Sequence, residues 1–181
     1  MSKKMKIIIF SSIGICIIIY FLSVILKDDY KEIEKAVRSI NQPMTNIAHV
    51  EIMGNTRAIA FYEWSNATDE YFGITKLKKN LFGWHVDDGS TSATPENYKI
   101  GWSVSNLAGD DFDYSSLLYG KISDPGIEEV VIVTDSGNEN SANIVEYGAG
   151  ERFYWYLFAE EPAAFTTIGR SKEGEIIEQY P

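Results

Sequence analysis

The feature that most limits how this chain can fold is an apolar run over residues 7–26, IIIFSSIGICIIIYFLSVIL, which contains no charged residue. At about 1.5 Å per residue, a helix of this length spans about 30 Å, the thickness of the hydrocarbon core of a bilayer. Backbone groups in lipid must be hydrogen-bonded within their own segment, so a helix is required despite the many isoleucines. The run therefore predicts a transmembrane helix whose partner is the lipid bilayer.

The residues on either side of the run predict its orientation and its processing. Lys3, Lys4 and Lys6 precede it without any acid, whereas lysines and acids are mixed after it. Because cytoplasmic flanks carry the excess of Lys and Arg, we expect residues 1–6 in the cytoplasm and residues 27–181 outside the cell membrane. No small-residue cleavage site follows the run, which favours an uncleaved single-pass signal-anchor over a cleaved signal peptide.

The distribution of charge and cysteine excludes several classes of function. All 26 acidic residues lie at or after Asp28, so the part after residue 26 carries 13 Lys and Arg against 26 acids, a formal net charge of −13. Such a surface repels nucleic acid, and we exclude nucleic-acid partners. The single cysteine, Cys16, lies inside the apolar run, which leaves the outer part without a disulfide or a thiolate metal site. Cys16 also follows Ile15 rather than the small residue that a lipoprotein signal needs.

Residues 28–41 predict an amphipathic helix. Tyr30, Ile33, Val37 and Ile40 recur at spacings of three and four residues, which places them on one helical face. A proline shortly after the segment prevents the helix from continuing. We expect this face to pack on the rest of the domain, and a membrane-proximal contact with a second chain is the alternative.

The rest of the chain alternates short segments of β-forming residues with turns, about every ten residues. This spacing, without a further long helix, predicts one domain of the α+β class that is mainly β, with a mostly antiparallel sheet. Polar residues predict long loops at 87–97 and 109–115, a short turn at 78–80, and a hairpin turn at 172–174. The expected strands are 47–53, 56–64, 71–77, 83–86, 98–105, 117–122, 129–134, 142–147, 152–158, 165–170 and 175–179.

One predicted strand, residues 152–158, is apolar on both faces, because Phe153, Trp155 and Leu157 alternate with three further aromatic residues. We expect a central strand with Trp155 buried in the middle of the sheet. One face would lie on the sheet core and the other under the helix at 28–41. The alternative is an exposed aromatic row, which would mark a partner or a sugar site.

The sequence contains no motif that assigns a catalytic, cofactor-binding or metal-binding residue. The two histidines, His49 and His85, have no metal-binding spacing, and the segment 101–105 lacks the final glycine of a nucleophile elbow. Acidic clusters at 110–113 and 135–140 offer oxygens without the spacing of a calcium-binding loop, so solvated loops are favoured over a weak calcium site. We therefore assign no cofactor and no enzymatic activity.

The C-terminal half contains three segments that resemble a known group of proteins. They are LLYGKISDPGIEEVVI, NIVEYGAGERFYWYLF and a final hairpin around SKEGEII, with the shared elements Tyr119–Gly120, Asp124–Ile127, the aromatic strand after Arg152 and Gly174. In these elements the chain resembles small membrane- or lipid-anchored extracytoplasmic proteins of Bacillus-type bacteria. The resemblance implies a location and a fold type, and it supplies no catalytic residues.

Together these features predict a membrane-anchored extracytoplasmic module that binds or senses a component of the bacterial cell envelope. A regulatory or structural subunit of a membrane complex is the alternative, in which the helix at 28–41 contacts another envelope or membrane protein. An envelope hydrolase is a third hypothesis, and it requires an aromatic cleft lined by two carboxylates.

Overall fold

The computed structural model describes residues 15, 28–40, 43–66, 69–93, 98–109 and 112–180. Apart from Ile15, the predicted transmembrane helix at 7–26 lies outside the described residues, as does the predicted cytoplasmic segment 1–6. Within the described part of the chain, no helix combines the length and the apolar character that are needed to cross a bilayer.

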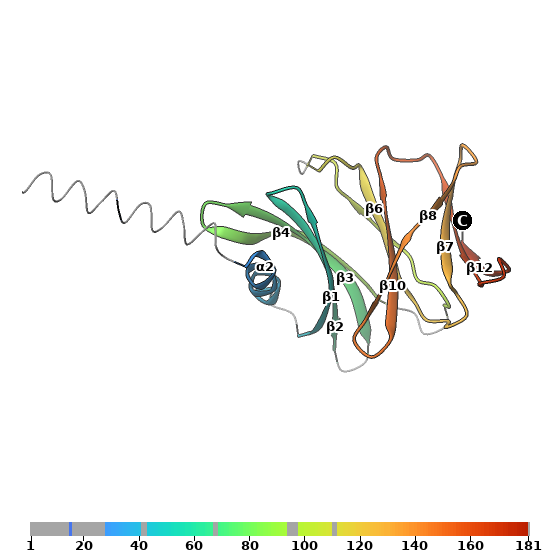
Figure 1. Ribbon diagram of the computed structural model, residues 1–181, viewed down its shortest axis with the longest axis horizontal. Coiled ribbons are helices and arrows are strands. Elements are labelled where there is room, and N and C mark those ends of the chain that lie inside the picture. The colour runs from blue at the N-terminus through green and yellow to red at the C-terminus, as the bar shows by residue number, and fades with distance from the viewer. Residues whose placement is uncertain are drawn as a thin grey trace, which may run out of the picture.

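Three four-stranded antiparallel sheets and the helix α2 (Asp29–Arg38) make up the described domain (Figure 1). Sheet A has the order β1-β2-β3-β4 and consists of β1 (Met44–Met53), β2 (Arg57–Ser65), β3 (Glu70–Asn80) and β4 (Gly83–Ala93). Sheet B has the order β5-β6-β10-β9 and consists of β5 (Ser103–Asn106), β6 (Ser116–Ile122), β10 (Glu151–Phe158) and β9 (Asn143–Tyr147). Sheet C has the order β12-β11-β7-β8 and consists of β12 (Ile176–Tyr180), β11 (Phe165–Arg170), β7 (Glu129–Thr134) and β8 (Glu139–Ser141). The prediction of a mainly β, antiparallel domain is confirmed.

Sheets B and C are joined by one bent strand. β8 and β9 are separated only by Ala142, whose N–H donates to the carbonyl oxygen of Val130 over 2.8 Å. β8 pairs with β7 in sheet C, whereas β9 pairs with β10 in sheet B. The bend at Ala142 therefore carries the chain from sheet C to sheet B, and these two sheets pack on each other.

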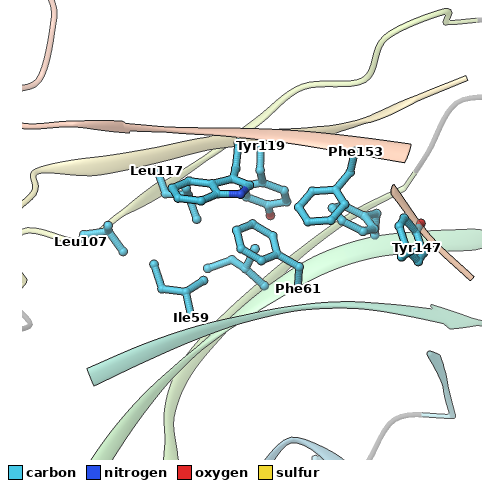
Figure 2. Close-up of a cluster of buried hydrophobic side chains, with 10 residues drawn as sticks. Ile59, Phe61, Leu107, Leu117, Tyr119, Tyr147 and Phe153 are labelled. Carbon is cyan, nitrogen blue, oxygen red and sulfur yellow. The ribbon is translucent and has the colours of Figure 1, made fainter. Parts of the chain in front are cut away.

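Apolar side chains fill the three spaces between four layers, which follow one another as α2, sheet A, sheet B and sheet C. Between α2 and sheet A lie Ile33, Ala36, Val37, Ala58, Ala60, Tyr62, Leu77 and Trp84. Between sheets A and B lie Ile59, Phe61, Phe72, Ile74, Leu107, Leu117, Tyr119, Tyr147, Phe153 and Trp155, and Figure 2 shows Phe61 reaching from sheet A toward Phe153 and Tyr119. Between sheets B and C lie Ile100, Leu118, Ile122, Ile127, Val130, Ile132, Tyr154 and Phe158.

The aromatic strand β10 occupies the position that its two-sided apolarity predicts. It lies inside sheet B between β6 and β9, and Phe153 and Trp155 enter the core shared with sheet A. Tyr154 and Phe158 point the other way, into the core shared with sheet C. The prediction that α2 covers the second face of β10 is wrong, because sheet C covers it.

The helix instead packs on sheet A, the sheet that follows it directly in the chain. Ile33 and Val37 are fully buried there, and the small side chains of Ala58 and Ala60 on β2 leave room for the helix. Tyr30, on the same helical face, is 50% exposed. The apolar face of the helix is therefore used largely within the domain.

The ends of α2 follow from local side-chain chemistry. Asp28 is the N-cap, and its Oδ1 accepts a hydrogen bond from the N–H of Tyr30 over 3.2 Å. Near the other end, Arg38 Nε lies 2.9 Å from Glu34 Oε1, one turn earlier. The helix ends at Arg38 with Ser39 as its C-cap, short of the predicted end at residue 41.

Three local predictions in sheets A and B are wrong. Residues 87–93 continue β4 rather than forming a loop, because Asp88 and Asp87 are neutralised by Lys76 and Lys78 on the adjacent strand at 3.1 and 2.6 Å. The expected turn at 78–80 belongs to β3, and the turn comes after Asn80. The expected strand at 98–105 is reduced to β5 at residues 103–106 and a single bridge at Ile100.

Candidate functional site

A groove lies between the β1–β2 hairpin and the bent strand of sheets B and C. It arises because the bend at Ala142 takes β8 away from β10, so that the last three residues of β10 pair only with β6. The groove has a volume of about 510 Å³, within the range of small-molecule sites. Its lining residues are Glu51, Ile52, Met53, Gly54, Arg57, Phe112, Asp113, Tyr114, Ser141, Asn143, Trp155, Tyr156 and Leu157.

The groove combines aromatic and apolar walls with ionisable groups. Trp155 is only 9% exposed but contributes part of its surface to the groove, and Tyr114, at 36% exposed, stands at its border. Two carboxylates, Glu51 and Asp113, and the guanidinium of Arg57 supply charge of both signs. Apolar walls with a few polar groups are the usual composition of a binding site for a small ligand.

Sequence reasoning assigned no residue to this groove. Of the acidic cluster at 110–113, Asp113 lines it, while Asp110 and Asp111 lie outside the described residues. The aromatic strand was the other sequence signal that pointed here. The lining residues are spread from residue 51 to residue 157 and come together only because sheet A packs on sheet B. A local spacing in the sequence therefore could not reveal the site.

A second polar site, the Lys121 cluster, comprises Glu63, Lys121, Tyr147 and Glu151. Lys121 Nζ lies 2.7 Å from Glu63 Oε1 and 3.2 Å from Glu151 Oε2. The hydroxyl of Tyr147 donates to Glu63 Oε1 over 2.6 Å. These side chains come from four strands, β2, β6, β9 and β10, and a pocket of about 220 Å³ adjoins them.

The contacts of the Lys121 cluster and the pKa values of its members favour a structural role. Burial alone would lower the pKa of Lys121, but its hydrogen bonds and charge attraction to Glu63 and Glu151 leave the pKa raised. Burial, together with the hydrogen bond to Glu63, raises the pKa of Tyr147 far above its ordinary value. A lysine held as a cation and a tyrosine held as a phenol do not act as bases or nucleophiles near neutral pH. The cluster therefore fastens sheet A to sheet B.

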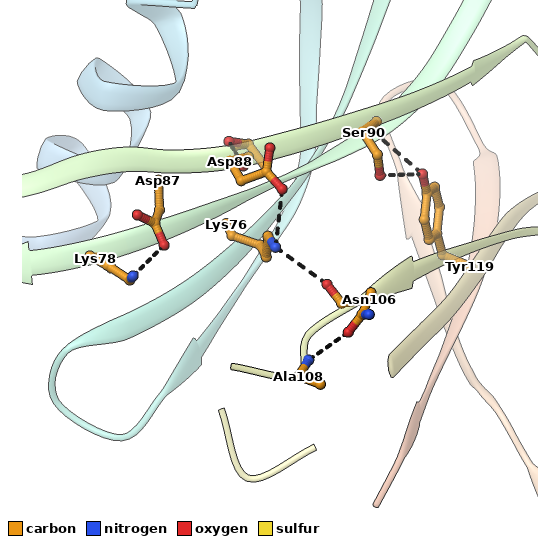
Figure 3. Close-up of polar contacts among 9 residues, drawn as sticks. Lys76, Lys78, Asp87, Asp88, Ser90, Asn106, Ala108 and Tyr119 are labelled. Carbon is orange, nitrogen blue, oxygen red and sulfur yellow. Dashed lines mark hydrogen bonds and ion pairs between the residues drawn. The ribbon is translucent and has the colours of Figure 1, made fainter. Parts of the chain in front are cut away.

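A similar set of polar contacts joins the two sheets at another point of their interface (Figure 3). Lys76, whose side chain is 6% exposed, lies 3.1 Å from Asp88 Oδ2 and donates to the carbonyl oxygen of Asn106 on β5 over 3.3 Å. The hydroxyl groups of Ser90 and Tyr119 are 3.2 Å apart. Sheets A and B are thus held by polar contacts as well as by their apolar core.

We expect the domain to lose stability as the pH rises above 10. Burial raises the pKa of Tyr62 to about 12 and also raises the pKa of Tyr154 above the ordinary 10.0. The folded chain then keeps protons that the unfolded chain releases. The stabilisation is complete below pH 10 and falls above it by about 1.4 kcal/mol per pH unit for each tyrosine, until the folded pKa is reached. Urea unfolding at neutral pH and above pH 10 measures this loss.

Two tyrosine variants separate this cause from a general effect of alkali. Tyr154→Phe should lessen the loss, because it removes one buried phenol, while Tyr30→Phe, at a half-exposed tyrosine, should leave it unchanged. If Tyr154→Phe loses stability between neutral and alkaline pH as steeply as the native chain, the buried phenol of Tyr154 is not a cause of the loss.

The histidines and those residues of the acidic turns that the structure describes do not converge on a metal site. His49 packs its ring 6.0 Å from that of Phe61 and has its Nε2 3.2 Å from Glu51 Oε2, whereas His85 is exposed on β4. In the turn between β7 and β8, Ser136 Oγ lies 2.8 Å from Thr134 Oγ1 and accepts a hydrogen bond from Asn138 Nδ2, while residues 139 and 140 of the predicted turn belong to β8. Among the residues that the structure describes, no group of three His, Cys, Asp or Glu side chains could hold a metal ion.

No protein-family model, curated protein or solved structure matches this chain. The groove, the apolar run and the chemistry of the surface are therefore the features of the chain that bear on its function.

Proposed function

We propose that the chain is a membrane-anchored extracytoplasmic binding module of the bacterial cell envelope, and that the groove is its binding site. The observation that carries the proposal is the groove itself, with its apolar walls, its polar border and its volume of about 510 Å³. The apolar run at residues 7–26 and the lysines before it support the membrane location. The resemblance to anchored extracytoplasmic proteins of Bacillus-type bacteria agrees with that location.

A subunit of a membrane complex and an envelope hydrolase are the two alternatives to a binding module. A subunit that contacts its partner through α2 loses most of the surface it would use, because Ile33 and Val37 are fully buried against sheet A. An envelope hydrolase is the second candidate, favoured by Glu51 and Asp113, two carboxylates that line a groove with Trp155. Paired carboxylates beside a sugar are the machinery of most glycosidases.

The full chain with a photo-crosslinking phenylalanine analogue in place of Tyr114 tests location and binding together. Tyr114 lines the groove and is 36% exposed, so the analogue can reach an occupant without disturbing the core. After irradiation of intact cells, we expect a crosslinked product that stays with the membranes through a carbonate wash. Protease added outside protoplasts should digest it.

Matched variants give this experiment its controls. Asn143→Trp fills the groove from β9 and should abolish the product, and the analogue at Lys172, in the β11–β12 turn, should give none. A product that persists in Asn143→Trp would contradict binding in the groove. Release by the carbonate wash, or protection from protease, would contradict the location. A hydrolase would instead accumulate more product when Glu51→Gln and Asp113→Asn are combined, because turnover would stop while binding continued.

A further inference from the structure

The turn between β3 and β4 carries the most exposed pair of large apolar side chains in the described part of the chain. Leu81 is 67% exposed and Phe82 is 86% exposed. The turn is ordered by its own contacts, since Asn80 Oδ1 accepts a hydrogen bond from the N–H of Phe82 over 2.7 Å. We call Leu81 and Phe82 the apolar tip. Exposing two neighbouring large apolar side chains to water is unfavourable in free energy, which indicates that another surface covers them.

The strands behind the apolar tip are fastened to the first residue of α2. Lys79 Nζ on β3 lies 2.5 Å from Asp29 Oδ1, and the indole N–H of Trp84 on β4 donates to the same oxygen over 3.0 Å. The Lys79 ammonium also lies 5.6 Å from the centre of the Trp84 ring. A hydrogen bond from Lys79 is the main cause that lowers the pKa of Asp29, so the carboxylate stays charged in this contact. The hairpin is thus attached at both strands to residue 29.

Residue 29 stands three positions after Leu26, where the predicted transmembrane run ends. Three residues of extended chain reach at most about 11 Å, so Asp29 must lie close to the bilayer surface if residues 7–26 span it. Figure 1 shows α2 and the β3–β4 hairpin at the same end of the domain, with sheet C at the opposite end. The apolar tip is therefore held at the end of the domain that carries Asp29, which follows the predicted span by three positions in the chain.

We propose that Leu81 and Phe82 insert into the interfacial region of the same bilayer that holds residues 7–26. This inference rests on the anchor in the proposed function and adds a second point of attachment to it. Apolar side chains partition into the boundary between headgroups and acyl chains, as they do on interfacial helices. The domain carries a formal net charge of −13 after residue 26, so the attraction is apolar rather than electrostatic.

A second point of attachment fixes the orientation of the domain on the membrane. The β1–β2 turn lies at the same end of sheet A as the apolar tip, since the N–H of Lys79 donates to the carbonyl oxygen of Thr56 over 2.9 Å. That hairpin also forms one wall of the groove. The docked domain would therefore hold the groove in a fixed orientation beside the bilayer. Without the second attachment, the domain would rotate about the end of the predicted transmembrane helix.

Spin labelling of the full chain in phosphatidylcholine proteoliposomes tests the inference. Cys16→Ser removes the single native cysteine, and a nitroxide is attached at Leu81→Cys with Phe82 intact. We expect the ratio of oxygen to nickel-chelate collisions at residue 81 to exceed severalfold the ratio at Lys172→Cys, a position exposed in the distal β11–β12 turn. Phe82→Ser should return the label at residue 81 to the aqueous value, and its exposed position means that the fold is kept.

A label on the native Cys16 separates the failure of this inference from failure of the anchor. A lipid-exposed label at residue 16 with an aqueous label at residue 81 overturns membrane contact by the apolar tip and leaves the anchor standing. An aqueous label at residue 16 contradicts the anchor and the proposed location. If Phe82→Ser leaves residue 81 in lipid, insertion does not depend on the apolar tip and the inference is wrong.

Discussion

Gly120→Ala is expected to prevent folding, or to lower the free energy of unfolding by about 3 kcal/mol or more. A Cβ at Gly120, on β6, would lie 1.9 Å from the carbonyl oxygen of Gly101 and 2.4 Å from its carbonyl carbon. Both are backbone atoms, which cannot rotate away as a flexible side chain could. Urea unfolding of the domain beginning at Lys27, followed by circular dichroism, measures the loss against the native domain.

The close approach at Gly120 exists because the segment before β5 runs antiparallel beside β6. Gly101 donates its N–H to the carbonyl oxygen of Lys121 over 2.8 Å, and Ile100 forms a bridge with Ile122. Ile100 is fully buried in the core between sheets B and C. A Cβ on Gly120 would lift this segment and withdraw Ile100 from that core.

Gly101→Ala is the matched control, because it adds the same methyl group to the other glycine of the pair. Its Cβ would lie 3.5 Å from Lys121 N and 3.7 Å from Lys121 O, which are ordinary contact distances. We expect its effect on the free energy of unfolding to stay within about 1 kcal/mol. Equal urea midpoints of unfolding for Gly120→Ala and the native domain would show that the segment around Gly101 does not pack against β6.

The sequence predicts those parts of the fold in which the buried residues recur at the regular spacing of a single helix or strand. The spacing of Ile33 and Val37 predicts the buried face of α2, and the structure confirms it. The alternation from Phe153 to Phe158 predicts a strand buried on both sides, which is also confirmed. Each of these predictions needs only the geometry of one element.

The parts that the sequence does not predict depend on contacts between distant elements. Residues 87–93 look like a loop because their charges have no local explanation, and only pairing with Lys76 and Lys78 makes them a strand. Likewise, two apolar faces on β10 require two covering layers, but do not reveal that sheet C rather than α2 is the second. The groove follows from the bend at Ala142, and a single alanine carries no signal of a bend.

Trp155→Ala is expected to lower the free energy of unfolding by about 3–5 kcal/mol, a large share of the total of about 5–15 kcal/mol for a domain. Trp155 is 9% exposed at the centre of sheet B, where it pairs with Tyr119 on one side and Asn143 on the other. Its ring centre lies 6.1 Å from that of Phe61 on sheet A. Truncation would leave a cavity between the two sheets that rigid strands cannot close.

Two tryptophan variants show whether the loss is due to the buried ring. Trp102→Ala removes a ring that is 51% exposed and should cost much less in the same urea unfolding experiment. For Trp155→Phe we expect a loss in the free energy of unfolding between those of Trp155→Ala and Trp102→Ala, because phenylalanine keeps part of the ring volume. This variant also removes an indole N–H that is buried without a hydrogen-bond partner among the described residues. If Trp155→Ala unfolds at the native urea concentration, the ring does not support the core. The exposed aromatic row would then become the better account of β10, with Trp155 serving the groove as a platform for its ligand rather than as part of the core between the sheets.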